Sequence, residues 1–404
     1  MLVQAFWIME NLWIENTPAR FWLCQPDLSD RQWEEACQKA LPVLGLPVQP
    51  QDSKTMTELV LGEAQFGPCH WQLSPLKRLY YQLKPILPRC LTCFLRRLYK
   101  APAEIRFPLN WPIETRYARF QWEIMRQLLL LSQKQAFTFS YFWPEGHRFA
   151  FVLTHDVETS KGLANIQPVA ALEESLGFRS SFNFVPDRYP LNAELRQELV
   201  ERGFEIGVHG LKHDGKLFKS QESFNKRAIQ INHYLETWEA VGFRAPLTHR
   251  NPAWMQRLHI DYDLSFFDTD PYEPLPGGAM SIWPYIIGRF VELPYTLPQD
   301  ATLTTVLGEK TPRIWLQKVD FIEAYHGMVL LNTHPDYLTD KTNWEVYKAF
   351  LQAMKKRRGY WHALPKEVAR WWRKRCQYTQ KQGLPDIAQG VVHLESKAII
   401  SVSA

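Results

Sequence analysis

Four short polar clusters in the second half of the chain contain the residue types of a hydrolytic metal site. They are 154–158 (THDVE), 209–214 (HGLKHD), 244–246 (RAP) and 331–335 (LNTHP). Histidine and carboxylate side chains are the ligands that ions such as zinc take from proteins. A carboxylate beside such an ion can also accept a proton from water. The clusters therefore indicate metal-assisted hydrolysis.

The first cluster ends an apolar run and supplies two carboxylates. Residues 149–153 are aromatic or aliphatic, which predicts a buried strand over 149–154. Asp156 and Glu158 follow it two positions apart, and residues with this spacing on a strand point to the same side. One carboxylate can therefore hold an ion while the other accepts a proton. The pattern does not decide which of the two is the ligand.

His209 and His213 lie four residues apart, directly after a predicted strand over 204–208. We expect one helical turn to bring both imidazoles to the same side, where they would form half of a divalent-metal site. A histidine pair with this spacing is more often an ordinary surface pair. The nearby carboxylates make the metal interpretation stronger.

A third histidine, His334, follows a predicted strand over 328–331 and could protonate a leaving amine as a general acid. It would need a carboxylate to hold its charge, and Asp300 or Asp336 could serve. The alternative is a histidine that lines the core. Arg244 could hold the proton-accepting carboxylate in a bidentate pair, and Arg250 competes for this role.

The elements that must position these residues alternate between strand and helix from residue 149 onward. Besides the strands named above, we expect a strand over 180–185 and helices over 165–176, 192–202 and 220–241. This rhythm predicts an α/β fold with a largely parallel sheet, open or closed into a barrel. Function is expected at the carboxyl ends of its strands.

The chain divides into three expected parts: an extension over 1–145, a barrel over 146–375 and a tail over 376–404. The extension is rich in Trp, Pro and Leu, with helices expected near 30–41, 76–98 and 111–133. Its segment 77–100 is the most basic part of the chain and could contact an anionic membrane surface. A solvated face on a packed helix is the more common explanation of such a segment.

Composition excludes several classes of protein. A net charge of +5 spread over 404 residues does not favour nucleic-acid binding. No apolar run approaches the roughly 18 residues of a membrane-spanning helix, and the N-terminus lacks the basic start of a secretory signal. Six irregularly spaced cysteines fit a reducing compartment. We therefore expect a cytoplasmic protein, with peripheral membrane contact if segment 77–100 binds a membrane surface; the sequence assigns no oligomeric state.

Together the clusters resemble the polysaccharide deacetylases, the nodulation-factor deacetylase homology domain of carbohydrate esterase family four. The likeness covers about 149–372, and its specificity lies in the order and spacing of the motifs. Segments 77–97 and 107–112 also look like sequence that precedes this domain in an intracellular, deacetylase-like branch. The resemblance implies that Asp156 is the base and that Glu158, His209 and His213 are the metal ligands. It also implies that Arg244 holds the base in place and that His334 is the general acid. Residues 268–271 fall where the family's fourth motif would lie.

The resemblance implies a distorted (β/α) barrel of about seven strands that uses zinc or a similar divalent ion to remove N-acetyl groups from an amino sugar or glycan precursor. The first motif departs from the usual Thr-Phe-Asp-Asp-Gly, because Glu158 stands two residues after Asp156. Two alternatives therefore stay open. One is a barrel amidohydrolase that acts on a small amide or imide, and the other is an inactive module that binds glycans.

Overall fold

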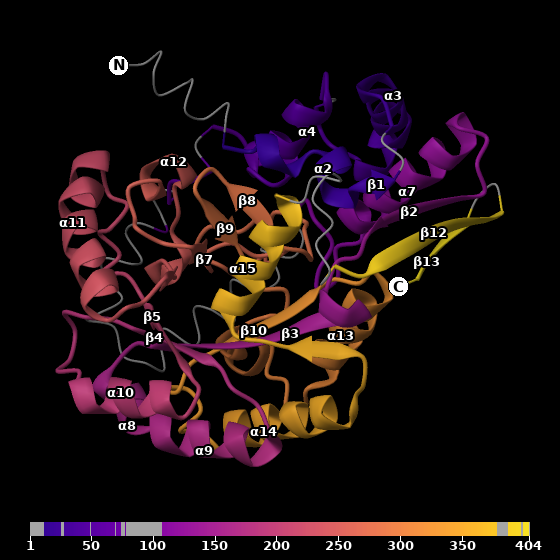
Figure 1. The fold of residues 1–404 in the computed structure, drawn as a ribbon. Helices are drawn as coiled ribbons and strands as arrows, with labels where there is room; N and C mark the ends of the chain where they lie inside the picture. Colours follow the sequence, from indigo (N-terminus) through magenta and orange to yellow (C-terminus); the bar gives the residue numbers. More distant parts are fainter. Residues whose placement is uncertain are drawn as a thin grey trace.

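In the computed structural model, a curled nine-stranded sheet forms the centre of the molecule (Figure 1). The structure describes residues 12–25, 28–48, 50–68, 70–73, 77, 107–377, 387–396 and 399–403. Seven strands of the sheet form a continuous parallel series: β3 (Phe149–Val157), β4 (Ser181–Phe184), β5 (Glu205–Val208), β6 (Gly242–Phe243), β7 (Tyr262–Asp263), β9 (Phe290–Glu292) and β10 (Met328–Thr333). β8 (Tyr285–Ile287) pairs antiparallel with β9, and β11 (Tyr360–His362) pairs in parallel with the start of β3.

Irregular backbone segments close this sheet into a ring. Beyond β7, the amide of Asp268 donates to the carbonyl of Tyr295 at 3.2 Å. The next residue, Thr296, donates its amide to the carbonyl of Leu330 in β10 at 3.1 Å. The wall between β6 and β10 therefore consists of two- and three-residue strands joined by irregular chain. The structure confirms the predicted distorted barrel of about seven strands.

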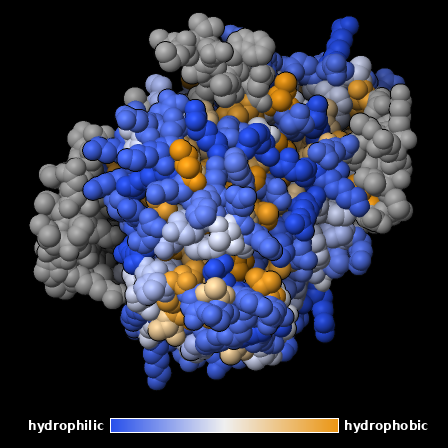
Figure 2. All heavy atoms as spheres, turned by 60° about the vertical axis from the view of Figure 1, so that its left-hand side comes forward, coloured by the Kyte–Doolittle hydropathy of each residue, from blue (hydrophilic) through white to orange (hydrophobic). Residues whose placement is uncertain are grey.

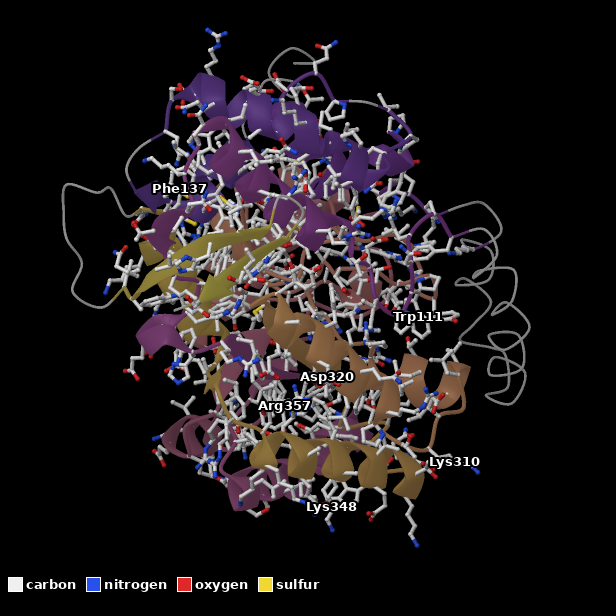
Figure 3. All side chains as sticks on the ribbon, turned by 90° about the vertical axis from the view of Figure 1, so that its right-hand side faces the viewer. Trp111, Phe137, Lys310, Asp320, Lys348 and Arg357 are labelled. Carbon is white, nitrogen blue, oxygen red and sulfur yellow. The ribbon has the colours of Figure 1, made fainter. Side chains whose placement is uncertain are left out.

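Helices follow the parallel strands and cover the outside of the barrel, with α8, α9, α10 and α14 on one side of β3, β4 and β10 (Figure 1). The helices are α8 (Ser160–Ala164), α9 (Ile166–Leu176), α10 (Ala193–Glu201), α11 (Gln221–Thr237), α12 (Pro252–Met255), α13 (Arg313–Ala324), α14 (Lys341–Lys356) and α15 (Pro365–Cys376). Side-chain caps mark several starts, since Asn192, Ser220 and Asp340 accept hydrogen bonds from the first backbone amides of α10, α11 and α14. Arg357, at the end of α14, pairs with Asp320 of α13 (Figure 3).

Several predicted elements have different bounds in the structure: the helix expected near 111–133 is α7 (Arg116–Leu131), and the strand expected over 328–331 continues to Thr333. The strand expected over 149–154 continues to Val157, because residues 154–157 pair with β4. Asp156 is therefore part of the strand. The helix expected over 220–241 ends at Thr237, and Glu239 then adopts a left-handed conformation with φ 52° that no α-helix continues.

The N-terminal extension is helical and rich in aromatic residues, as predicted. Its elements are η1 (Ile14–Asn16), α2 (Pro18–Trp22), α3 (Asp30–Ala40), η2 (Leu41–Leu44), α4 (Ser53–Val60), η3 (Ala64–Phe66) and α7 (Arg116–Leu131). The Asn16 side chain donates to the carbonyl of Ile286 in β8 and accepts from its amide, both at 2.8 Å. This pairing fixes the extension to the barrel wall.

A second sheet joins segments from both halves of the chain. Its order is β1 (Cys24–Gln25), β2 (Ala136–Ser140), β12 (Gln389–Ser396) and β13 (Ile399–Ser403), and its neighbours are antiparallel. Figure 1 shows this sheet beside α7. The segment 376–404, expected as a tail, thus contributes a hairpin that pairs with β2.

The longest helix among the described residues, α11, has 17 residues. No helix among these residues is both long and apolar enough to span a bilayer. On the face drawn in Figure 2, apolar side chains are scattered among polar ones. The helix predicted over 76–98 and the basic segment 77–100 lie outside the described residues, except for Lys77.

Candidate metal and catalytic site

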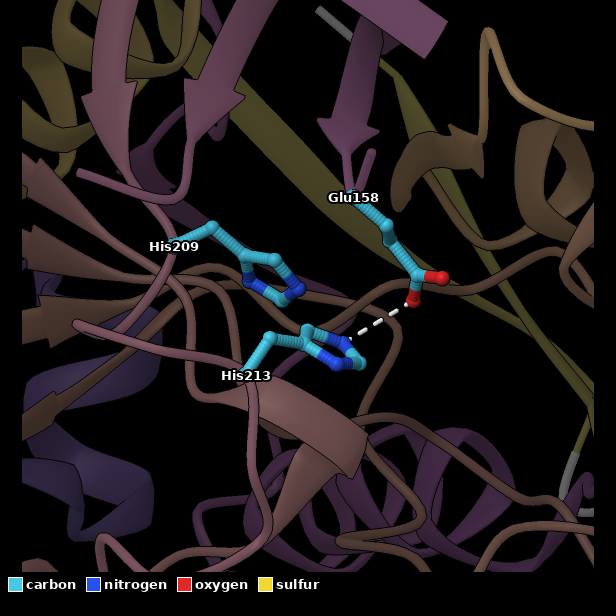
Figure 4. Close-up of side chains that lie close together, drawn as sticks. All are labelled: Glu158, His209 and His213. Carbon is cyan, nitrogen blue, oxygen red and sulfur yellow. Dashed lines mark ion pairs between the residues drawn. The ribbon is translucent and has the colours of Figure 1, made fainter. Parts of the chain in front are cut away.

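Three predicted ligands, Glu158, His209 and His213, come together at the carboxyl ends of β3 and β5 (Figure 4). One ligand atom from each residue lies within 4.8 Å of those of the other two. His213 Nε2 is 3.0 Å from Glu158 Oε1. Two imidazoles and one carboxylate are a common ligand set for zinc, with a further position left for water or substrate.

The hydrogen bonding of the two histidines fits a divalent ion. His209 Nδ1 lies 3.1 Å from the carbonyl oxygen of Arg244, so Nδ1 carries the proton and Nε2 presents a lone pair. Both Nε2 atoms, of His209 and His213, are buried without a hydrogen-bond partner among the described residues; the contact of His213 with Glu158 lacks hydrogen-bond geometry. Such buried orphans are uncommon. Burial also lowers the pKa of His209 to about 4, which keeps the imidazole neutral and able to bind a metal.

The expected helical turn between the two histidines is wrong. Residues 209–213 form an irregular loop in which Gly210 and His213 have left-handed φ values of 64° and 50°. A Cβ atom on Gly210 would lie 2.4 Å from Cγ of Pro246, so only glycine fits this turn. The tight loop, and not helix periodicity, directs His213 toward His209.

Asp156 lies beside the ligand set, with 3% of the residue exposed. Its Oδ1 accepts hydrogen bonds from Asn183 Nδ2 at 3.1 Å and Arg244 Nη1 at 3.2 Å. Its Oδ2 accepts from Asn332 Nδ2 at 2.9 Å. Burial alone would raise the pKa of Asp156, but the Arg244 guanidinium holds it below its usual range. Asp156 is therefore an ionised carboxylate next to the three ligands.

The structure brings Arg244 to Asp156, but not as the bidentate pair that was expected. Only Nη1 reaches the carboxylate, and the same nitrogen donates to Thr154 Oγ1 at 3.0 Å and to Asn332 Oδ1. Nε donates instead to the backbone carbonyl of Leu264, directly after β7, at 2.8 Å.

The competing arginine, Arg250, lies elsewhere. Its Nη2 forms a fully buried ion pair with Glu63 of the N-terminal extension at 2.6 Å. The guanidinium also lies over the ring of Phe267, 4.6 Å from its centroid. Arg250 therefore anchors the extension to the barrel and does not contact Asp156.

His334 pairs with Asp300, one of its two predicted partners. Asp300 Oδ1 lies 2.7 Å from His334 Nδ1, and Oδ2 accepts the His334 backbone amide at 2.8 Å. Burial opposes protonation, but Asp300 outweighs it and raises the pKa of His334 to about 10. The other ring nitrogen, Nε2, points toward the ligand set and lies 3.9 Å from Glu158 Oε1. Asp336 instead accepts the backbone amide of Glu158 at 3.0 Å.

The segment in the position of the fourth motif is buried in the barrel wall. Asp268 pairs with Lys318 of α13 at 2.7 Å, and both side chains are almost inaccessible. The nearby Glu273 accepts from Thr248 at 2.7 Å and from Gln299 at 2.8 Å. These contacts connect the loop after β7 to neighbouring parts of the wall.

Two residues of the site, Asn183 and Asn332, are absent from the sequence-based predictions. Asn183 lies in β4 and Asn332 in β10. The sequence predicted strands in both regions but assigned neither asparagine a role. The available signal was a polar side chain inside, or directly after, a segment that was predicted to be a strand. Such a side chain needs a partner when it is buried.

No protein-family model and no curated protein matches the chain. Solved structures similar to it include a probable polysaccharide deacetylase from Pseudomonas aeruginosa PAO1, with 16% identity over 59% of this chain and 96% of that chain and a TM-score of 0.47. PuuE allantoinase has 16% identity over 59% and 95%, with a TM-score of 0.46. A carbohydrate esterase family four pseudoenzyme from Bacillus anthracis has 14% identity over 56% and 66%, with a TM-score of 0.36. At these values the similarity does not determine the reaction.

Proposed function

We propose that the chain is a metal-dependent hydrolase that removes the N-acetyl group from an amino sugar or glycan precursor. The observation that carries the proposal is the convergence of Glu158 and the two orphaned imidazole nitrogens beside an ionised Asp156 and a protonated His334. The choice of an N-acetylated sugar rests on the order of the motifs, which resembles that of polysaccharide deacetylases. Zinc is the expected ion, because nitrogen and carboxylate ligands suit it.

Glu158, His209 and His213 would hold the ion, and Asp156 is then free to act as the base. A divalent ion bound there would polarise the acetyl carbonyl and make water more acidic. Asp156 accepts a proton from the attacking water as the water oxygen bonds to the carbonyl carbon. Arg244 keeps Asp156 ionised before this transfer.

His334 supplies the second proton transfer. As the carbon–nitrogen bond breaks, His334 Nε2 donates its proton to the departing nitrogen, which leaves as an amine while the acyl group leaves as acetic acid and ionises to acetate in solution. Asp300 holds the imidazolium in place through Nδ1. The proton taken by Asp156 is released to solvent, and His334 regains one, so the residues return to their starting states.

The proposal is tested by measuring bound metal and acetate release on the same preparations. We expect about one ion per chain and acetate release from N-acetylglucosamine oligomers or from nucleotide-linked and lipid-linked N-acetyl sugars. The H209A/H213A double variant should lose both, whereas replacement of His233, an exposed histidine on α11, should change neither. Acetate release that persists in the metal-free double variant would refute the mechanism.

The same preparations separate the two alternatives. Hydrolysis of imides or ureides without acetate release would assign the site to a small-amide amidohydrolase. Glycan binding without bound metal or turnover would assign it to an inactive binding module.

We further propose a cytoplasmic location, with segment 77–100 making peripheral contact with anionic membranes. The support is the cysteine usage and the basic composition of this segment. Cell fractionation at low and high salt tests both points, since an electrostatic membrane contact should be released by salt.

A further inference from the structure

We propose that Asn183 and Asn332 are positioning residues that fix the carboxylate of Asp156 and leave a single lone pair, on Oδ2, to accept the proton of the attacking water. This inference rests on the proposed function of the site. It adds two residues to the machinery and states which oxygen of the base reacts.

The hydrogen bonds around Asp156 identify the free lone pair. An ionised carboxylate offers about four acceptor positions, two on each oxygen. Oδ1 already receives Asn183 Nδ2 at 3.1 Å and Arg244 Nη1 at 3.2 Å, whereas Oδ2 receives only Asn332 Nδ2 at 2.9 Å. Three of the positions are therefore occupied, and the remaining one belongs to Oδ2.

The orientation of the Asn332 amide is determined by its other partners. Its Oδ1 lies within hydrogen-bond distance of Arg244 Nη1 and of Thr154 Oγ1, the latter at 3.2 Å. Both can donate, so the Asn332 oxygen faces them and its Nδ2 must face Asp156. Asn332 is thus a neutral bridge between the arginine and the second oxygen of the carboxylate.

The Asn332 amide takes the place of the second arm of a bidentate guanidinium, while Asn183 adds a second donor to Oδ1. Arg244 reaches only Oδ1, so without Asn332 nothing among the described residues would hold Oδ2. The donors come from three strand ends, β4, β6 and β10. Rotation of the carboxylate would therefore break hydrogen bonds on several sides at once.

The barrel provides space for Asn183 through a glycine on the neighbouring strand. Asn183 in β4 is in register with Gly207 in β5. A Cβ atom on Gly207 would lie 2.1 Å from Asn183 Oδ1, but 3.6 Å from the next nearby group, the carbonyl of Gly242. An alanine at position 207 should therefore displace Asn183 and little else.

This geometry provides a set of variants that separates positioning from general stability. N332A, N183A and G207A should each lower kcat for acetate release about 10- to 100-fold, because small displacements of a catalytic group are costly. KM and bound metal should change less than about threefold, since neither asparagine is a ligand. The G207A/N183A double variant should be no slower than N183A, because the side chain that G207A displaces is already absent in N183A.

A matched control lies on the opposite face of β10. Thr333 follows Asn332, is equally buried, and its Oγ1 lies 2.7 Å from His155 Nδ1. T333V removes a buried hydrogen bond without touching Asp156, so it should lower stability and leave kcat unchanged. Wild-type kcat in N332A and N183A, or an equal loss in T333V, would overturn the inference.

A structural readout separates this inference from the proposed function. Crystal structures of the zinc-loaded wild type and N332A should show the Asp156 carboxylate turned away from its original plane in the variant. An unchanged carboxylate would overturn the positioning role. A turned carboxylate in a protein that releases no acetate from any substrate would support the positioning role and refute only the proposed reaction.

Discussion

Replacement of the buried acid Glu205 by glutamine should make the protein more stable at neutral pH and leave its stability at acid pH nearly unchanged. Glu205 lies at the start of β5 and is 3% exposed. One carboxyl oxygen accepts from the Tyr262 hydroxyl at 2.8 Å, and the other accepts the Lys366 amide at 3.1 Å. Glutamine can keep both contacts, because its oxygen can face Lys366 while its amide group donates to the tyrosine oxygen.

The expected magnitude follows from the pKa of this residue. Burial raises the pKa of Glu205 from 4.5 to about 7. A raised pKa means that the folded protein retains a proton that the unfolded chain releases. The stability associated with the neutral acid is therefore fully present below pH 4.5 and is lost as pH rises through 7. A shift of this size corresponds to about 3 kcal/mol.

The assay is urea unfolding of both proteins with EDTA present, at intervals between pH 4 and pH 8. The free energy of unfolding of E205Q relative to wild type should rise by about 3 kcal/mol across this range, because only the wild type has an acid to ionise at position 205. The other titratable groups are the same in both proteins, so their contributions cancel in the difference. In a chain that keeps Glu205, Y262F should move the midpoint of the pH-dependent loss of stability to higher pH, because it removes a hydrogen bond that favours the ionised form of Glu205. A difference between E205Q and wild type that does not vary with pH would refute the reasoning.

Two further predictions concern the acid and the N-terminal extension. D300N should lower the pKa of His334, because Asp300 is the group that raises it. On the alkaline side of the pH profile, kcat should then begin to fall at a pH roughly one to three units lower than in wild type, with bound metal retained. An unchanged alkaline limb would contradict this. E63A should cost about 3–5 kcal/mol in urea unfolding, because it leaves Arg250 buried and uncompensated. The double variant E63L/R250M should recover much of that loss, and a double variant as unstable as E63A would argue against an unpaired charge as the cause.

The sequence predicted the parallel barrel because its elements are local and periodic. The apolar run before Asp156 and the strand before His209 could be recognised from their composition and from the polar residues that end them. Carboxyl ends of parallel strands meet at one edge, so the approach of Asp156, Glu158, His209 and His334 followed from the order of elements.

The remaining features depend on contacts between distant segments. The choice of Arg244 over Arg250 is made by Glu63, which lies 187 residues from Arg250 in the sequence. The pairing of β12 with β2 likewise joins segments that no local pattern relates. Asn332 could not be assigned from sequence, because a lone asparagine in an apolar strand gives no indication of which buried group it contacts.

The central claim is that His209, His213 and Glu158 surround one divalent ion. Anomalous diffraction at the zinc edge, on crystals of the zinc-loaded protein, tests it most directly. We predict one peak about 2.0–2.2 Å from Nε2 of both histidines and from a carboxylate oxygen of Glu158. A loaded protein with no peak at this position, or with its zinc bound by other residues, would contradict the account.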